Sequence, residues 1–296
     1  MSTGVLLMTY GAPAGRDDLP AYLAKVRGGK EPAPELVEEM ARRYERIGGS
    51  PLVRITTAQA EALERALGEG WLVAAGMRYS APHVADAAKA LVARGARRLV
   101  GVVMSPQWSP LLMGGYARAL DDAASALGVT ATIAGPWYRE PAFIEDLAAA
   151  VRDGVATGGG HVVLTAHSLP KRVYEAEPAY IDQLRETAEA VARRAGLDEW
   201  TWAYQSAGHT KEEWLRPDLT DVFPEIARTG HRAVVVAPVQ FLADHLEVLY
   251  DLDVAAVEQA AAAGLGYSRV AMPNTRPSFI AALADVARRA ALEPVA

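Results

Sequence analysis

Three polar side chains that could bind a metal ion or move a proton each follow an apolar, strand-like run in this chain. Tyr10 and His167 stand at the ends of such runs, and Glu247 comes a short loop later. An imidazole can accept a proton near physiological pH. Imidazole and carboxylate groups bind divalent metals, and a phenolate oxygen is a weaker ligand. These residue types therefore predict a site that handles a proton and a metal ion.

Each of these residues also has an ordinary structural explanation. A histidine at a strand end often makes only a structural hydrogen bond, and Tyr10 could be a core residue with a satisfied hydroxyl group. Glu247 and Asp251 are four residues apart, so they could form a solvated helix face, or a row of carboxylates that guides a cation. His245 is expected to brace the loop before Glu247. The position that the three residues share, after predicted strands, favours a common site.

Strand-like and helix-like segments alternate along the whole chain. Apolar, β-branched runs predict strands at residues 5–9, 72–76, 99–104, 131–134, 161–165, 201–204, 233–238 and 267–271. Amphipathic or alanine-rich runs predict helices at residues 34–47, 55–67, 82–93, 114–127, 141–153, 179–195, 217–229, 254–263 and 277–291. This alternation is typical of an α/β protein with parallel sheets flanked by helices.

Eight strands could form one barrel or two four-stranded sheets. The glycine-rich stretch 154–160 reads as a linker near the middle of the chain, which favours two similar α/β halves with a cleft between them. We therefore predict an N-terminal domain at 1–153 and a C-terminal domain at 154–276. The helix at 277–291 could pack back on the N-terminal domain.

Composition and charge exclude several classes of protein. The chain has 296 residues, a net charge of −6 and no basic run, so it is a poor candidate for binding nucleic acid. It contains no cysteine, which excludes disulfides and a cysteine-ligated iron–sulfur cluster. It shows neither a signal peptide nor an apolar run of the ~20 residues that span a membrane, so a cytoplasmic protein is expected. A nucleotide cofactor is not expected either, because no glycine-rich phosphate motif follows the first strand.

Other residues could line the predicted cleft. The apolar loop 106–113, with Trp202 and Tyr204, could form a wall for a flat apolar ligand or could pack in the core. Arg27 and Arg43 could pair with ligand carboxylates or could be surface charges.

The remaining histidines give weaker signals. His209 lies in a polar loop after a strand and could face the cleft. His161 and His231 lie at the starts of strands, at the edge opposite to the predicted site. No histidine pair has the spacing of a zinc motif.

Taken together, the motifs of this chain resemble those of the ferrochelatases, enzymes that insert ferrous iron into a porphyrin in haem biosynthesis. The chain is most similar to the short, soluble bacterial type, which is often specific for coproporphyrin III. The matching segments run in family order over nearly the whole chain, and one of them is Thr-Ala-His-Ser-Leu-Pro at 165–170. The others lie at 6–13, 43–52, 204–206, 214–215 and 241–251.

The resemblance implies two Rossmann-like domains with the porphyrin in the cleft between them. It implies that His167 and Glu247 form an inner pair that binds the metal and handles protons, and that Tyr10 approaches the iron axially. It also implies contacts between the porphyrin propionates and a set of residues, namely Arg27, Arg43, Ser50 and Tyr116.

Two departures from the family pattern concern metals. The family often continues its acidic row one turn beyond Asp251, where this chain has Ala255, which argues against an outer regulatory metal site. Some members carry an iron–sulfur cluster, which the lack of cysteine argues against here. No prosthetic group is therefore expected, and Fe²⁺ is expected as a substrate.

The predicted activity is insertion of Fe²⁺ into a porphyrin, either coproporphyrin III or protoporphyrin IX, between which the sequence does not choose. One alternative is a sirohydrochlorin-type chelatase for cobalt or nickel, and another is a non-catalytic carrier of haem or porphyrin. Phosphoryl transfer through His167 is disfavoured, because no cluster of arginines accompanies it. The expected partners are the porphyrin and the haem product, and the expected oligomeric state is a monomer.

Overall fold

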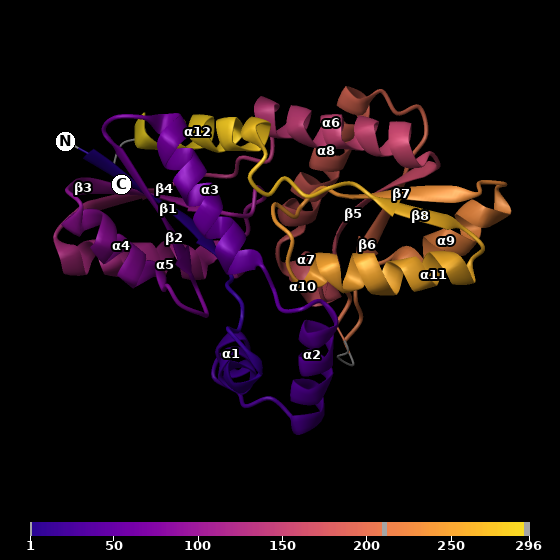
Figure 1. The fold of residues 1–296 in the computed structure, drawn as a ribbon, viewed down its shortest axis with the longest axis horizontal. Coiled ribbons are helices and arrows are strands. Elements are labelled where there is room, and N and C mark those ends of the chain that lie inside the picture. The colour runs from indigo at the N-terminus through magenta and orange to yellow at the C-terminus, as the bar shows by residue number, and fades with distance from the viewer. Residues whose placement is uncertain (1, 209–211, 293–296) are drawn as a thin grey trace.

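The computed structural model describes residues 2–208 and 212–292, and this part of the chain forms two parallel sheets side by side (Figure 1). The strand order is β2-β1-β3-β4 in the N-terminal sheet and β6-β5-β7-β8 in the C-terminal sheet. The strands are β1 (Ser2–Thr9), β2 (Trp71–Met77), β3 (Ala96–Val103), β4 (Thr130–Ile133), β5 (His161–His167), β6 (Thr201–Gln205), β7 (Ala233–Pro238) and β8 (Gly266–Arg269). The two sheets repeat one topology, and the predicted α/β fold with two four-stranded parallel sheets is confirmed.

The first strand of each half lies inside its sheet and is almost entirely apolar. Residues 5–8 of β1 have no solvent exposure, as expected for a parallel strand that helices cover on both faces. In β5 the apolar run is interrupted by Thr165, whose hydroxyl group donates a hydrogen bond to the side-chain oxygen of Gln205 in β6 at 2.5 Å. This bond offsets the cost of burying the threonine hydroxyl group.

Helices form at the segments that the sequence predicts. These helices are α2 (Pro34–Arg46), α3 (Leu52–Leu67), α4 (Val84–Ala93), α5 (Pro110–Leu127), α6 (Pro141–Gly158), α8 (Pro178–Ala195), α9 (Leu219–Arg228), α11 (Ala256–Ala262) and α12 (Pro277–Leu292). All of them except α2 pack against the sheets or against each other (Figure 1). Short helical segments that were not predicted are a 3-10 turn, η1 (Arg16–Asp18), and the helices α1 (Leu19–Val26), α7 (Lys171–Ala176) and α10 (Leu246–Leu249). A π-helical turn, η2 (Asp251–Ala255), extends the predicted helix at 254–263 toward the N-terminus. Segments this short hold too few turns for a helical period to be visible in the sequence.

The glycine-rich stretch 154–160 is not the open linker that its composition predicts. Its residues up to Gly158 end helix α6, and only Gly159 and Gly160 form the turn into β5, with positive φ angles. A Cβ atom at Gly154 would lie 2.9 Å from Val270 and 3.1 Å from Val235, so glycine here lets α6 pack closely on the C-terminal sheet. The division into domains at 1–153 and 154–276 stays a prediction.

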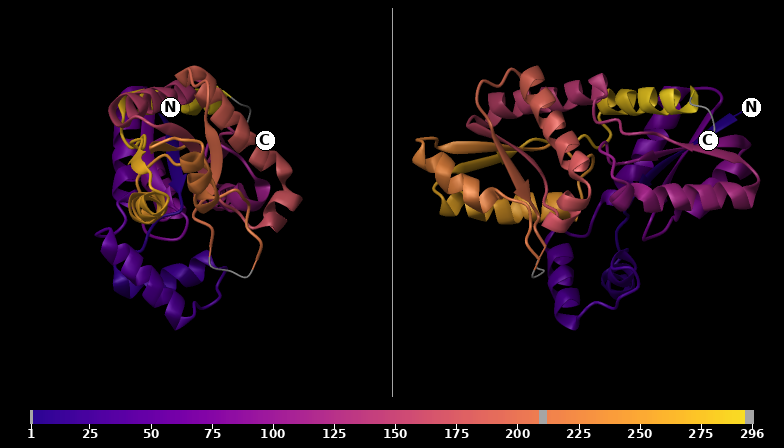
Figure 2. Two further views of the ribbon diagram at one scale, coloured as in Figure 1. Left: turned by 90° about the vertical axis from the view of Figure 1, so that its right-hand side faces the viewer. Right: turned by 180° about the vertical axis from the view of Figure 1, so that it is seen from behind.

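Helix α12 returns from the C-terminal half and lies along the N-terminal half, where it contacts α3, β3 and α6 (Figures 1 and 2). At the junction, the buried carboxylate of Asp146 in α6 accepts hydrogen bonds from Nε of Arg276 at 2.7 Å and from its Nη2 at 2.5 Å. A buried bidentate pair of this kind forms only when the guanidinium and the carboxylate have one relative orientation. The pair therefore fixes α6 against the segment that leads into α12.

A second link between the halves is made by Gln59 of α3, which is completely buried. Its side-chain amide donates hydrogen bonds to the carbonyl oxygens of Leu242 at 3.2 Å and Asn274 at 2.8 Å. Both acceptors lie in segments of the C-terminal half. The halves are thus joined by directional bonds as well as by apolar packing.

Helices α1 and α2 project from the N-terminal half (Figure 1). Their facing sides bury a small apolar cluster of Leu19, Tyr22, Leu23 and Ala41. The hydroxyl group of Tyr22 also donates a hydrogen bond to the carbonyl oxygen of Gly11 at 3.0 Å, which ties the projection to the loop after β1.

Candidate functional site

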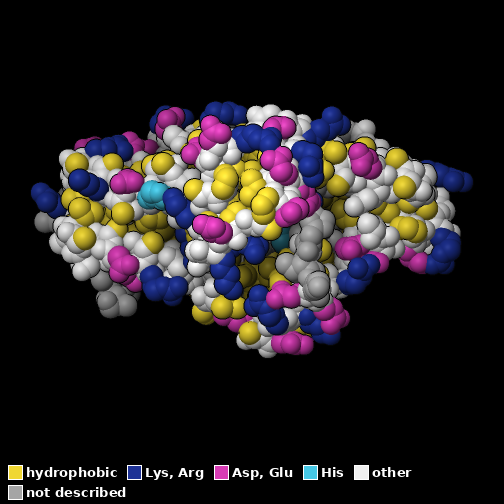
Figure 3. Space-filling view, turned by 90° about the horizontal axis from the view of Figure 1, so that it is seen from below, with side chains coloured by type: hydrophobic (Ala, Val, Ile, Leu, Met, Phe, Trp, Pro, Cys, Tyr) yellow, Lys and Arg dark blue, Asp and Glu magenta, His cyan; other side chains and the backbone are white. Residues whose placement is uncertain are grey.

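A cavity of about 580 Å³ lies between the two halves. Its wall is formed by residues at the carboxyl ends of β1, β2, β3, β5 and β7 and by residues of α1, α2, α3, α5, α8 and α10. In each sheet the chain continues on one side of its first strand and then crosses to the other side, so the strand order reverses next to β1 and next to β5. Open α/β sheets bind ligands at such a switch point. The volume is within the ~300–1,000 Å³ of ordinary ligand pockets. Hydrophobic side chains are visible in a hollow on this face, with Lys and Arg side chains around it (Figure 3).

His167 and Glu247 face each other in the wall of this cavity. Nε2 of His167 lies 3.4 Å from one carboxylate oxygen of Glu247, and Nε2 of His245 lies 3.5 Å from the other. The Glu247 carboxylate therefore stands between two imidazoles. His245 also donates from Nδ1 to the carbonyl oxygen of Ala243 at 2.9 Å, so it braces the loop as predicted and contacts Glu247 as well, which was not predicted.

The His167 ring is held in one orientation by its neighbours. Nδ1 of the ring donates to the backbone carbonyl of Ser168, which can only accept, so Nδ1 carries a proton and Nε2 is the atom that faces Glu247. The backbone N–H of His167 donates to the side chain of Gln240 at 2.9 Å, and Gln240 donates to the Tyr180 hydroxyl group at 2.7 Å. The reactive nitrogen of His167 is thus fixed toward the cavity.

Burial and pairing act in opposite directions on the pKa values of this pair. Burial lowers the pKa of His167, but the facing Glu247 carboxylate, with smaller contributions from Ser168 and Asp251, raises it to about 9. Burial raises the pKa of Glu247, but the His167 and His245 imidazoles hold it well below its usual range. At neutral pH the pair is therefore an imidazolium and a carboxylate. A metal ion that binds His167 has to displace this proton, because only a neutral imidazole ligates.

Asp251 lies one turn beyond Glu247, at the start of the π-helical turn η2. Its carboxylate is 3.6 Å from Nη1 of Arg43, and its side chain is only 16% exposed, so it is not part of a solvated helix face. Burial raises the pKa of Asp251 above its usual value. The arrangement places a second carboxylate behind Glu247.

Tyr10 lines the same cavity, after β1. Its ring makes an edge contact with the ring of Tyr79, with 4.6 Å between the centroids. Enclosure in the cavity wall, followed by the proximity of Tyr79 and Glu247, raises the pKa of Tyr10 above its ordinary value. Tyr10 is therefore a neutral phenol at neutral pH. The structure brings Tyr10, His167 and Glu247 to one cavity, and the role of each stays a prediction.

The four residues expected to contact propionates fall into two groups. Ser50 and Tyr116 line the cavity. Arg27 is exposed at the end of α1 and is not among the lining residues. Arg43 is not among them either: its guanidinium pairs with Glu39 at 2.5 Å and stacks on the Tyr250 ring at 5.0 Å.

Arg78 is a cationic residue of the cavity wall that the sequence analysis missed. Its guanidinium lies 4.9 Å from the ring centroid of Tyr79 and 5.3 Å from that of Tyr116, and it donates to the carbonyl oxygen of Leu112 at 3.2 Å. A side chain at Gly115 would collide with it. Arg78 directly follows β2, so the strand-end rule that selected Tyr10 would have found it.

The expected wall for a flat apolar ligand is only partly present. Leu111, Leu112 and Met113 of the predicted loop line the cavity. Trp202 and Tyr204 do not: they are buried in the hydrophobic core, with their rings 5.4 Å apart. Trp202 and Tyr204 are two residues apart in β6, so their side chains lie on the same face of the sheet. The sequence does not show whether that face turns toward the cleft. His209 lies outside the described residues.

Known proteins match this chain over nearly its full length. A family model described as Ferrochelatase matches residues 2–291. The chain is 37% identical to the coproporphyrin III ferrochelatase of Anoxybacillus flavithermus, over 96% of this chain and 94% of that protein. It is 36% identical to the ferrochelatase of Deinococcus radiodurans, over 98% of this chain and 96% of that protein. The crystal structure of the sirohydrochlorin chelatase SirB from Bacillus subtilis subspecies spizizenii in complex with cobalt has the same fold, with a TM-score of 0.59 at 14% identity, over 99% of this chain and 97% of that one.

The paired parallel sheets, with a cavity between them, define an α/β protein that shares its fold with the SirB structure. The chain belongs to the ferrochelatase family. This confirms the resemblance and the predicted enzyme class, a metal chelatase and lyase of haem biosynthesis. Among the described helices, none is both long and apolar enough to cross a membrane.

Proposed function

We infer that this chain inserts Fe²⁺ into coproporphyrin III held in the cavity between its halves. The observation that carries this proposal is the pair formed by His167 and Glu247, which come from different strand ends and face each other at 3.4 Å in the cavity wall. Metal insertion needs a base for the pyrrole protons and a donor set for the incoming cation, and this pair supplies both chemistries.

Proton handling is centred on Nε2 of His167. Two N–H protons must leave the macrocycle as Fe²⁺ enters it. Nδ1 is engaged by the Ser168 carbonyl, so Nε2 accepts a pyrrole proton once it has lost its own. Fe²⁺ that approaches Glu247 weakens the ion pair, so Nε2 releases its proton to solvent. Nε2 then accepts the two pyrrole protons one after the other and passes the first to solvent before it takes the second, while Glu247 relays iron to the ring or a released proton to solvent. Tyr10 approaches the opposite face of the ring as a neutral phenol.

The cavity walls contribute by holding the porphyrin in a distorted shape. A planar ring keeps its nitrogen lone pairs in its own plane, where an approaching ion cannot reach them. Apolar contacts along the wall, such as those from Leu112, Met113 and Leu246, supply the binding energy for this distortion.

The choice of coproporphyrin III rests on the relatives and on the charge of the site. Relatives at 36–37% identity carry that substrate in their names. Coproporphyrin III has more propionates than protoporphyrin IX, and Arg78 in the cavity wall can pair with one of them.

A steady-state assay with Fe²⁺ and each porphyrin tests the proposal. We expect a higher kcat/KM with coproporphyrin III. A preference for protoporphyrin IX would refute the assigned substrate, and faster insertion of Co²⁺ or Ni²⁺ into sirohydrochlorin would refute the assigned reaction. Tight haem binding without any acceleration of insertion would identify a carrier.

We also propose that the enzyme works as a monomer in the cytoplasm and without an iron–sulfur cluster. The lack of cysteine supports the last point, because clusters of this kind are held by cysteine thiolates. Sedimentation of the purified protein tests the oligomeric state.

A further inference from the structure

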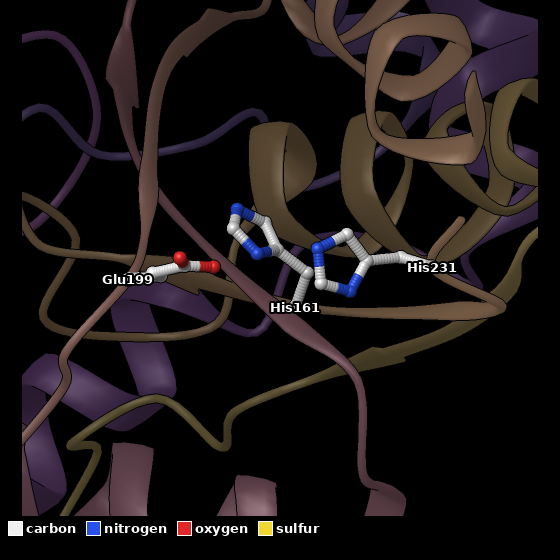
Figure 4. A group of neighbouring side chains, drawn as sticks. All are labelled: His161, Glu199 and His231. Carbon is white, nitrogen blue, oxygen red and sulfur yellow. The ribbon is translucent and has the colours of Figure 1, made fainter. Parts of the chain in front are cut away.

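We propose that the chain holds a second divalent metal ion, of the zinc class, between His161, Glu199 and His231. This site is independent of the insertion reaction. One donor atom from each of these residues lies within 4.8 Å of the other two. Figure 4 shows the two imidazole rings side by side, with the Glu199 carboxylate next to them.

The three residues come together because of the strand order. His161 is the first residue of β5, Glu199 comes just before β6, and His231 comes just before β7. These strands are neighbours in the order β6-β5-β7, so their amino ends meet at one edge of the C-terminal sheet. His161 and His167 are the two ends of a 7-residue strand, which places them about 20 Å apart at ~3.3 Å per residue. The cluster is therefore separate from the cavity.

The neighbours of His161 suit a metal ligand. Its Nε2 is 2.8 Å from the hydroxyl oxygen of Thr201. When Nε2 donates its proton to Thr201, Nδ1 carries the lone pair that a metal needs, and such a second hydrogen bond is typical of ligating histidines. The rings of His161 and His231 have centroids 4.5 Å apart, so two imidazoles already share one small volume.

The donor set selects the class of ion. Two imidazoles and one carboxylate suit Zn²⁺, Co²⁺, Ni²⁺ or Fe²⁺, whereas Ca²⁺ and Mg²⁺ prefer oxygen ligands. Metal–ligand bonds of ~2.1 Å in a tetrahedron place donors about 3.4 Å apart. The cluster has to contract slightly to reach this spacing. Glu199 is exposed and can rotate to do so, and water can complete the coordination.

The ion would act as a clamp on the C-terminal sheet. It would tie the starts of three adjacent strands, including the strand that carries His167 at its other end. A ligand that binds only the folded state raises the melting temperature, so Zn²⁺ should stabilise the protein.

The experiment uses the full chain, stripped of metal and free of porphyrin, and titrates it with Zn²⁺ by calorimetry. The His167→Ala background removes one ligand of the cavity and so weakens metal binding there, and the variants of the cluster then identify the binding event that belongs to the second site. In that background we expect Zn²⁺ to bind. His231→Gln should abolish this binding, and Glu199→Gln should weaken it tenfold or more. Asp198→Asn is the matched control and should leave the affinity for Zn²⁺ unchanged. Zn²⁺ should raise Tm in the His167→Ala background and in the control, but not with His231→Gln.

Circular dichroism establishes that each variant is folded. If His231→Gln fails to fold, the exposed Glu199→Gln variant decides. Equal Zn²⁺ stoichiometry and affinity in Glu199→Gln and in the control would overturn the proposal. Because no porphyrin is present, this result is independent of the outcome of the insertion assay.

Discussion

Nε2 of His167 lies 3.4 Å from the Glu247 carboxylate, although His167 ends β5 and Glu247 lies in α10, after β7. The contact couples their protonation, since each holds the other in its charged form. At neutral pH the pair is thus an imidazolium that faces a carboxylate, and this charge state can be tested by experiment.

Replacing His167 by alanine should lower the rate of Fe²⁺ insertion about 100-fold or more, because a positioned general base contributes ~10²–10⁴-fold. Porphyrin affinity should change little, since many other side chains line the cavity. Insertion kinetics under anaerobic conditions and a porphyrin fluorescence titration measure the two effects. Near-normal insertion with porphyrin still bound would refute the role of His167. His231→Gln, at the opposite edge of the sheet, is the control and should insert iron normally.

The rate of insertion should rise with pH as His167 loses its proton, with a pKa of about 9 in the free enzyme. Glu247→Gln removes the carboxylate that raises this pKa, so burial then dominates and the pKa falls. The midpoint of the profile of kcat/KM against pH should therefore move to lower pH in the variant, together with a lower maximum. Identical midpoints in the two proteins would show that another group controls the profile.

The stability of the porphyrin-free protein should depend on pH through the same pair. The folded pKa of His167 is raised from 6.5 to about 9, so its contribution is complete below about pH 6.5 and is lost as the pH rises through 9. The folded pKa of Glu247 is lowered, so its contribution is present above about pH 4.5 and is lost in acid. Urea unfolding should show a larger loss between about pH 6 and pH 10 for the wild type than for Glu247→Gln. A parallel decline in both proteins would contradict the assignment.

Arg78→Gln should raise KM for the porphyrin about tenfold, because a charge-assisted hydrogen bond to a propionate contributes ~1.5–3 kcal/mol. The effect on kcat should be smaller, since the contact is made in the ground state as well as in the transition state. Arg27→Gln should have the weaker effect, because Arg27 is exposed and is not among the lining residues. Steady-state kinetics of both variants test this order, and a larger effect at Arg27 would reverse our assignment.

Gly76→Ala should destabilise the protein by about 1–3 kcal/mol through overpacking. A Cβ atom at Gly76 would lie 2.9 Å from the backbone Cα of Val84, and a helix backbone moves less easily than a side chain. Gly135→Ala is a matched control, because no atom lies within 4 Å of its added Cβ, and it should change stability by less than about 0.5 kcal/mol. Urea unfolding of the two variants gives the comparison, and equal stabilities would disprove the packing argument.

The sequence by itself determined the strands, most of the helices and the strand ends that carry Tyr10 and His167. These features depend on apolar runs and helical periods, which are visible over a few neighbouring residues. The short helices and the helical path of residues 154–158 were missed, because their formation depends on packing against the sheets rather than on local pattern.

Only the tertiary structure decided which side chains meet. It placed His245 against Glu247, Arg43 against Asp251 and Arg78 in the cavity wall, and it put Trp202 and Tyr204 in the core instead. It also joined His161 with Glu199 and His231 at the opposite edge. Such contacts follow from the order of strands in a sheet and from the close packing of the two halves. Both depend on many weak interactions between residues far apart in the chain, which a local sequence pattern does not show.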